Sequence, residues 1–237
     1  MMKMRDRLSL AFGLLLVTAP ASAQTKTYAL ESAEGLRLHN VGAEPATLEG
    51  RKGLKLTLSA DAAKSIESAP AALQALEQLA LIDGLVFSNG VIEAEIAGTP
   101  GPGAGGGARG FVGIAFRVQA DRKSYDAFYL RPTNGRADDQ ERRNHAAQYI
   151  AHPDWPWNRL RQETPSRYEA YVDLQPGTWT RIKIEVRGDK ARLYVHGNEQ
   201  PTLVVNDVKS GAAASGGVAL WLGPGTIAHF RNLTAKP

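Results

Sequence analysis

The feature that most constrains this chain is the alternation of apolar and polar residues with a period of two. In residues 182–186 and 191–195, Ile, Leu and Val alternate with charged or polar residues on either side of Gly188-Asp189. Such alternation is typical of half-buried β-strands, and Gly-Asp favours a tight hairpin turn. Further strands are predicted at residues 36–39, 54–58, 91–96, 109–118, 125–131, 202–205, 217–222 and 226–233. Many short strands separated by turn residues predict an antiparallel β-sandwich.

One segment departs from this pattern. The run AALQALEQLALI places Leu73, Leu76 and Ala80 on one face at helical spacing, and Asp83-Gly84 follows it. It predicts one short packing helix near residues 70–82. Residues 98–107 are rich in glycine, but they lack the lysine and the strand–turn–helix context of a phosphate-binding loop. We therefore expect them to form a flexible hairpin loop.

The first 23 residues are typical of an export signal. Three basic residues precede an apolar run over residues 8–17, and Ala21-Ser22-Ala23 is a small-residue cleavage signature. The apolar run is too short to span a bilayer, so no membrane insertion is expected. Residues 24–237 are expected to form a single domain, because all-β domains of this length are often single. The absence of cysteine fits a periplasmic or secreted protein without disulfides.

The net charge gives little support to a nucleic-acid partner. The formal charge is +4 at pH 7, and removing residues 1–23 takes away three basic residues and one acidic residue, which leaves +2. Nucleic-acid binding depends on a concentrated basic surface, and such a small excess does not predict one.

Residues 125–171 hold the chemistry-bearing side chains. Between Arg131 and Arg167 there are seven arginines and no lysine, together with two histidines and two tryptophans. Arginine is the residue of planar, bidentate recognition, and aromatic rings beside it suit polar, ring-shaped ligands. Carboxylates of the same segment, at positions 138, 139, 141, 154 and 163, are expected to pair with most of the arginines. One or two of the arginines are expected to reach a ligand, Arg131 and Arg143 before the others.

Four stretches carry a resemblance to a known family: GVIEAEI, GFVGIAFRV, GTWTRIKIEVRGDKARLYVHGNEQP and GGVALWLGPGTIAHFRNLT. They resemble the concanavalin A-like lectin/glucanase jelly roll, and most nearly the bacterial exported domains of the 3-keto-disaccharide hydrolase type. The resemblance covers residues 85–235. It implies an all-β fold of two curved antiparallel sheets, a carbohydrate ligand on the concave sheet, and in some members a structural calcium ion.

The catalytic motifs of these relatives are not present here. Glu93-Ala94-Glu95 lacks the aspartate and the spacing of the laminarinase motif, and Gly110-Phe111-Val112-Gly113 replaces the Asn-Ser-Gly of the disaccharide hydrolases. Gln148 and His152 are four residues apart, whereas alginate-lyase-like proteins use Gln-x-His. Glu93 and Glu95 share a strand face at about 7 Å, but ordinary acidic strands do so too, and we expect a face that is solvated or paired with Arg117.

The ligand-binding candidates come from the strand face opposite the core and from the arginine-rich loop. In residues 112–118 the even-numbered side chains are expected to face the core, which places Arg117 on the reverse, and alternation turns Trp221 away from the core as well. Two exposed indoles of Trp155-Pro156-Trp157 could stack on sugar rings, although Trp157 could equally fill the end of the core. The predicted set is Arg117, Tyr125, Tyr129, Arg131, Asn134, Arg143, His145, Gln148, Tyr149, Trp155 and Trp221.

Three functional hypotheses remain open from the sequence. The first is an exported protein that binds a glycan on the concave sheet and the 131–167 loop. The second is a glycoside hydrolase or lyase in which His145 and Tyr149 act as acid and base. The third is a structural or protein-interaction module. No metal site is predicted, because His145 and His152 are seven residues apart and do not form a typical ligand cluster.

Overall fold

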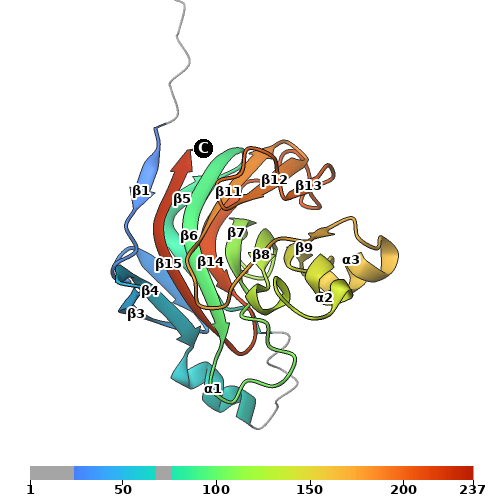
Figure 1. Cartoon of the computed structure of the whole chain (residues 1–237). Helices are drawn as coiled ribbons and strands as arrows, with labels where there is room; N and C mark the ends of the chain where they lie inside the picture. Colours follow the sequence, from blue (N-terminus) through green and yellow to red (C-terminus); the bar gives the residue numbers. More distant parts are fainter. Residues whose placement is uncertain (1–23, 68–75, 237) are drawn as a thin grey trace, which may run out of the picture.

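The structure is a computed structural model and describes residues 24–67 and 76–236. The predicted export signal, residues 1–23, lies outside these ranges. Two antiparallel sheets pack face to face, and the larger sheet curves around the smaller one (Figure 1). The prediction of an all-β sandwich is confirmed.

The larger sheet has eight strands, in the order β13-β12-β11-β6-β15-β4-β3, with β1 paired to β15. Its strands are β1 (Lys26–Tyr28), β3 (Val41–Leu48), β4 (Arg51–Leu58), β6 (Gly90–Pro100), β11 (Thr180–Arg187), β12 (Lys190–Val195), β13 (Leu203–Val205) and β15 (Thr226–Lys236). The predicted hairpin at Gly188-Asp189 joins β11 to β12.

The smaller sheet has seven strands, in the order β10-β9-β8-β7-β14-β5-β2. Its strands are β2 (Leu36–His39), β5 (Leu79–Phe87), β7 (Val112–Val118), β8 (Tyr125–Leu130), β9 (Ala147–His152), β10 (Glu169–Ala170) and β14 (Gly216–Leu222).

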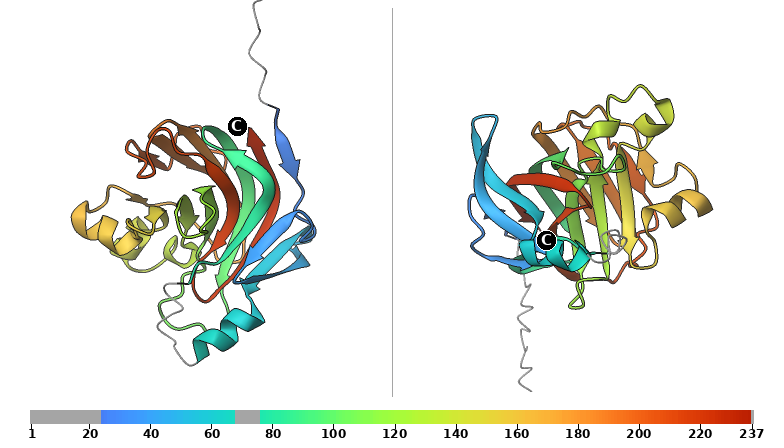
Figure 2. Two further views of the ribbon diagram at one scale, coloured as in Figure 1. Left: turned by 180° about the vertical axis from the view of Figure 1, so that it is seen from behind. Right: turned by 90° about the horizontal axis from the view of Figure 1, so that it is seen from below.

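The helices are short and lie outside the sandwich. In the described residues they are α1 (Ala60–Glu67), the 3-10 turn η2 (Pro132–Asn134), α2 (Gln140–Asn144) and α3 (Trp157–Glu163). Helices α2 and α3 lie together at the end of the smaller sheet that holds β9 and β10, and α1 lies at a separate place below the sheets (Figures 1 and 2). No helix of the described residues is long and apolar enough to cross a membrane.

The helix predicted near residues 70–82 is wrong in its second half. Residues 68–75 lie outside the described ranges, residues 76–78 are irregular, and residues 79–82 belong to β5. All four side chains from Leu79 to Ile82 are buried. Strand β5 pairs with β14 on one edge and β2 on the other, which explains the result: a strand with both neighbours and both faces covered is continuously apolar and shows no alternation.

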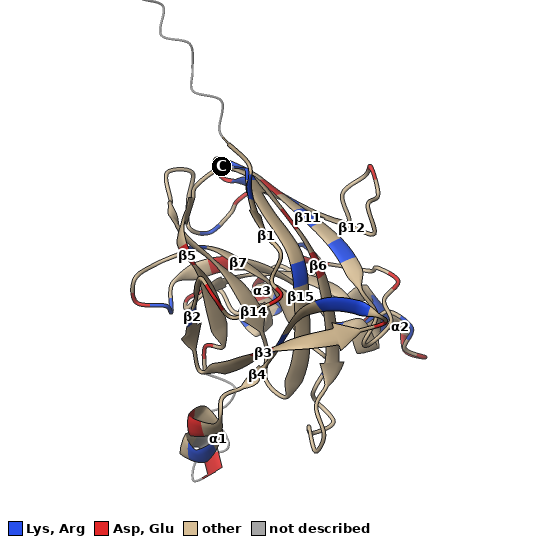
Figure 3. Ribbon diagram, turned by 90° about the vertical axis from the view of Figure 1, so that its left-hand side faces the viewer, with Lys and Arg blue, Asp and Glu red and all other residues tan. Residues whose placement is uncertain are grey.

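The core lies between the sheets and follows the predicted alternation. Ile92, Ala94 and Ile96 of β6 face inward, while Glu93 and Glu95 are on the outer face. Those two carboxylates pair with arginines of neighbouring strands, Glu93 with Arg181 and Glu95 with Arg51 and Arg231. Figure 3 shows basic and acidic residues mixed on this outer face. The face is ion-paired through arginines of β4, β11 and β15, and the expected pairing with Arg117 is wrong.

Arg117 does not lie on the outer face of β7, where the alternation of residues 112–118 predicts it. The register between β14 and β7 shifts between Gly217 and Val218, and Arg117 has a φ of 55°. Such a bulge inserts an extra residue and redirects its side chain. Arg117 is fully buried and donates to the carbonyls of Ser88, Gly188 and Gly211. It ties the two sheets together at one end, and none of its described contacts faces a cavity.

Candidate functional site

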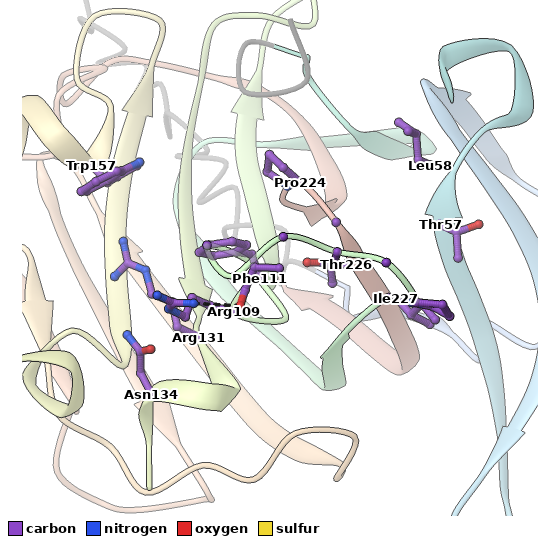
Figure 4. Close-up of a pocket in the computed structure, with 18 of the residues that line it drawn as sticks. Thr57, Leu58, Arg109, Phe111, Arg131, Asn134, Trp157, Pro224, Thr226 and Ile227 are labelled. Carbon is purple, nitrogen blue, oxygen red and sulfur yellow. Dashed lines mark hydrogen bonds between the residues drawn. The ribbon is translucent and has the colours of Figure 1, made fainter. Parts of the chain in front are cut away.

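A cavity of about 960 Å³ lies at the end of the sandwich where segments distant in sequence meet. It has the size of a typical ligand pocket, which is roughly 300–1,000 Å³. Trp157, Arg131 and Asn134 lie along one side, Thr57, Leu58 and Ile227 lie along the other, and Phe111 is between them (Figure 4). Its main walls are the β6–β7 loop, the β14–β15 turn, η2, α2 and the first turn of α3.

The glycine-rich loop forms one wall and is not a hairpin, which corrects the sequence-based expectation. Strand β6 belongs to the larger sheet and β7 to the smaller, so the loop crosses from one sheet to the other. A Cβ on Gly98 would overlap the Gly110 carbonyl and Val112, so glycine is required where the two ends of the loop cross. The amide of Gly101 donates to Gly225 at 2.8 Å, which attaches the loop to the β14–β15 turn.

Arg131 fixes the opposite wall. It follows β8, and its guanidinium donates to the Tyr129 hydroxyl at 2.7 Å and to Gln148 Oε1 at 3.0 Å. It also donates to the His145 carbonyl at 2.9 Å and lies 3.3 Å from Glu169. Because the side chain is only 5% exposed and several of its donors are engaged, its position is set by the protein.

Glu169 of β10 supplies the negative charge beneath this wall. Its carboxylate, 3% exposed, accepts hydrogen bonds from Arg131 and Arg161. His145 Nδ1 lies 3.0 Å from Glu169 Oε2, although neither ring nitrogen has an aligned hydrogen bond. Burial is the main cause that lowers the pKa of His145. The charges of Arg161 and Arg131 lower it further, while Glu169 and Glu141 raise it.

Below the arginines, the outer face of the smaller sheet is aromatic. Tyr129 and Trp221 stack at 4.7 Å between ring centroids, and the residue between them in the register is Gly113. A side chain on Gly113 would overlap Tyr129, so this glycine leaves the space in which the two rings meet. Burial raises the pKa of Tyr129 to about 12, which keeps its hydroxyl neutral as a partner for Arg131.

The aromatic face is closed rather than an open groove. Tyr125, Tyr129 and Trp221 are all buried. The Tyr125 hydroxyl bonds to Glu77 and to His152 Nδ1 at 3.1 Å, and it accepts from Trp221 Nε1 at 3.0 Å. Trp221 therefore faces away from the core, as expected, but its ring is buried and supports the wall of the cavity from below.

The exposed ring at the cavity is Trp157. It begins α3, is 44% exposed, and lies under the Arg161 guanidinium at 4.7 Å. Phe111 is half-buried and projects from the start of β7. Trp155 lies elsewhere, covered by Arg159 at 3.9 Å and Lys209 at 4.6 Å. Of the two indoles in Trp155-Pro156-Trp157, only that of Trp157 thus lines the cavity.

The structure divides the predicted site residues into three groups. Arg131, Asn134 and His145 line the cavity. Tyr129, Gln148 and Trp221 support it, and Tyr125 is bonded to Trp221. The remaining four do not line it: Arg117, Arg143, Tyr149 and Trp155.

Tyr149 and His145 do not form the acid–base pair considered from the sequence. Tyr149 faces the core, where it donates to Asp126 at 2.5 Å and packs on Phe128. Burial, followed by the charge of Asp126, raises its pKa well above the usual value. Gln148 and Tyr149 are consecutive in β9, so their side chains must project to opposite faces. Gln148 joins the Arg131 group on the outer face, and His145 is on that side too.

Sequence reasoning missed several lining residues. Arg109, Arg142 and Arg161 supply cationic groups, and Phe111 supplies an apolar one. Arg142 and Arg161 belong to the arginine-rich segment, residues 131–167. The concentration of arginine there is the sequence signal that could have found them. Arg109 and Phe111 flank the loop that was interpreted only as a connection. Within residues 24–67 and 76–236, no three His, Asp or Glu side chains cluster as metal ligands.

Comparisons with known proteins identify the fold. No family model matches the chain, and no curated protein matches its sequence. Among solved structures, a Bacillus subtilis protein of unknown function with a galectin-like fold aligns with TM-score 0.55 and 12% identity, over 89% of this chain and 94% of that one. The carbohydrate-binding module CBM66 from Bacillus subtilis aligns with TM-score 0.51 and 12% identity, over 84% and 97% of the two chains.

These observations define the class of structure. The chain is a galectin-like jelly-roll β-sandwich, a fold that it shares with a carbohydrate-binding module. The identity is low, so the likeness concerns the fold, and function must be argued from the cavity itself.

Proposed function

We propose that this chain is an exported glycan-binding protein whose ligand enters the cavity between the glycine-rich loop and the arginine-rich segment. The observation that carries the proposal is the pairing of an exposed ring, Trp157, with polar side chains that the protein holds in place. Export to the periplasm or beyond is part of the proposal, and it rests on the signal-like pattern of residues 1–23.

The chemistry of the wall suits a sugar. A sugar ring has apolar C–H faces that pack on an aromatic ring, and hydroxyl groups that need both donors and acceptors. Trp157 and Phe111 supply the apolar contact. Asn134 is buried and donates to the His145 carbonyl at 3.2 Å, which fixes its amide in the cavity wall. The similarity in fold to a carbohydrate-binding module supports the same conclusion.

The test compares two aromatic residues with equal exposure. Trp157 and Tyr171 are each 44% exposed, and each lies beside an arginine, but only Trp157 lines the cavity. Binding to a panel of soluble oligosaccharides is measured by calorimetry for Trp157→Ala and Tyr171→Ala. Loss of a stacked ring costs about 1–3 kcal/mol on general grounds, so Trp157→Ala should weaken binding at least fivefold. Tyr171→Ala should leave it unchanged.

The proposal fails if no oligosaccharide binds, or if both variants retain the affinity of the wild type. A protein that binds no glycan would instead fit the third hypothesis, a structural or protein-interaction module. A glycan whose retention depends on Tyr171 alone would place the site elsewhere.

A hydrolase or lyase on the same scaffold is the second candidate, and it includes the resemblance to the exported 3-keto-disaccharide hydrolases. The observation in its favour is His145, which faces the cavity with Glu169 3.0 Å behind it, an arrangement that can orient a general base. Product release that His145→Gln abolishes, with glycan binding retained, would establish this function. Binding without product release would support the first proposal. A structural calcium ion, implied by the family resemblance, is tested by chelation during thermal unfolding.

A further inference from the structure

The cavity has an excess of positive charge. Arg109, Arg131, Arg142 and Arg161 line it, and among the described residues that line it none is Asp or Glu. Glu169 is buried behind the wall, and Arg131 and Arg161 share its carboxylate. Two of the four guanidinium groups therefore have no carboxylate partner among the described residues.

The two unpaired groups are Arg109 and Arg142. Arg109 donates only to backbone carbonyls of its own loop, Gly106 at 2.6 Å and Ala108 at 3.1 Å. Burial lowers the pKa of Arg109, and the positive charges of Arg142 and Arg131 lower it further. Arg142 forms no side-chain hydrogen bond or ion pair with the described residues, and its Nε is buried without a partner. The positive charges of Arg109, Arg131 and Arg142 lie close enough to oppose one another, which is unfavourable until an anion arrives.

Arginines of the same segment that face away from the cavity provide an internal comparison. Arg136 pairs with Asp173, Arg159 with Glu163, and Arg167 with Asp207. Arg143, next to Arg142 in α2, donates to the Tyr171 hydroxyl at 2.9 Å and lies over its ring. Among the arginines of residues 131–167, Arg142 is thus the one whose side chain has no hydrogen bond or ion pair with the described residues.

We propose that the ligand is an anionic glycan, whose acidic group binds between Arg109 and Arg142 while its ring contacts Trp157. This inference rests on the proposed glycan-binding function. The planar fork of a guanidinium matches a carboxylate in two parallel hydrogen bonds, so a uronic acid is the first class to test. A sulfated sugar presents the same charge through oxygen atoms and forms a second arm of the experiment.

The experiment compares acidic sugars with neutral versions of the same backbone. Short oligomers of galacturonan, glucuronan and alginate are each supplied as the free acid and as the methyl ester, together with neutral and sulfated oligosaccharides. Dissociation constants are measured by calorimetry at low and moderate salt. One acid should bind at least tenfold more tightly than its ester, and the difference should shrink as salt increases, because the charges are partly exposed.

Arg142→Gln and Arg143→Gln are the matched variants, since the two residues are adjacent in one helix and only the first lines the cavity. Arg142→Gln should remove most of the preference for the acid and retain the weaker binding of the ester. Arg143→Gln should retain the preference. Circular dichroism and thermal unfolding establish that both variants are folded.

The outcomes separate the two proposals. Equal or tighter binding of esters and neutral oligosaccharides, still dependent on Trp157, would overturn the anionic inference and leave glycan binding intact. No binding of any oligosaccharide would overturn both. Binding restricted to sulfated sugars would support the anionic ligand and reject the uronate. A loss of acid preference in Arg143→Gln but not in Arg142→Gln would place the anion outside this cavity.

Discussion

Replacing Glu169 by Gln tests whether the cavity wall is held by a buried ion pair. The side chains of Arg131 and Glu169 are 5% and 3% exposed, so water cannot replace the lost charge. Removing one partner of a buried pair typically costs about 3–5 kcal/mol, because the other charge stays buried without compensation. Gln keeps an oxygen that can accept from Arg131, so we expect the lower end, about 3 kcal/mol.

This free energy corresponds to a large change in thermal unfolding. A domain of this size loses about 2–4 °C per kcal/mol, so the midpoint should fall by about 6–12 °C. Urea unfolding at pH 7 should show a matching shift of the midpoint with an unchanged slope. The control is Asp173→Asn, which breaks an ion pair with Arg136 whose side chains are 53% and 61% exposed. That exposed pair should contribute about 1 kcal/mol or less.

A double-mutant cycle with Arg131→Met makes the test specific to the pair. Once Arg131 is absent, Glu169→Gln should cost less than it does in the wild type, because only Arg161 is then left without its carboxylate. If Glu169→Gln is as stable as Asp173→Asn, or if the two substitutions are additive, the buried pair does not hold the wall and the reasoning is refuted.

Two further substitutions and a pH series test other parts of the structure. Gly113→Ala should destabilise the fold by about 1–3 kcal/mol, because its Cβ would overlap the Phe128 carbonyl and Tyr129 on the neighbouring strand; Gly105→Ala, which meets nothing within 4 Å, should change stability by about 0.5 kcal/mol or less in urea unfolding. Burial and then the charge of Lys55 lower the pKa of His229, so the unfolded chain binds more protons than the folded one as the pH falls below about 6.5. Stability present above that pH should therefore decline between pH 6.5 and 5.5, and His229→Gln should reduce the decline. Greater stability of the wild type at pH 5.5 than at pH 7.5 would contradict the direction of this shift.

Much of the sandwich could be predicted from local patterns. Strands with one buried face, such as β6 and β11, alternate in sequence because successive side chains project to opposite faces. The hairpin at Gly188-Asp189 could be predicted because its turn needs a residue with positive φ, and Gly188 has a φ of 61°. These features depend on near neighbours in the chain.

Predictions failed where contacts with a segment distant in sequence gave a structure that the local residue pattern does not indicate. The run from Leu79 to Ile82 has the composition of a helix, but pairing with β2 and β14 makes it a central strand. Arg117 has the position of an outward-facing residue, but the bulge opposite Gly217 and Val218 turns it inward. Neither β14 nor the bulge can be inferred from residues near Arg117.

The sequence by itself determined that this chain would form a β-sandwich and that arginine and aromatic side chains would be concentrated in residues 131–167. Both are properties of short stretches, set by residue type and spacing. Only the tertiary structure decided which arginines are paired, because most of their partners, such as Asp173, Asp207 and Glu169, lie outside that stretch, whereas Glu163, the partner of Arg159, lies within it. It also decided that Arg109 and Arg142, 33 positions apart, would line the same cavity. Such proximity comes from the packing of whole strands and loops.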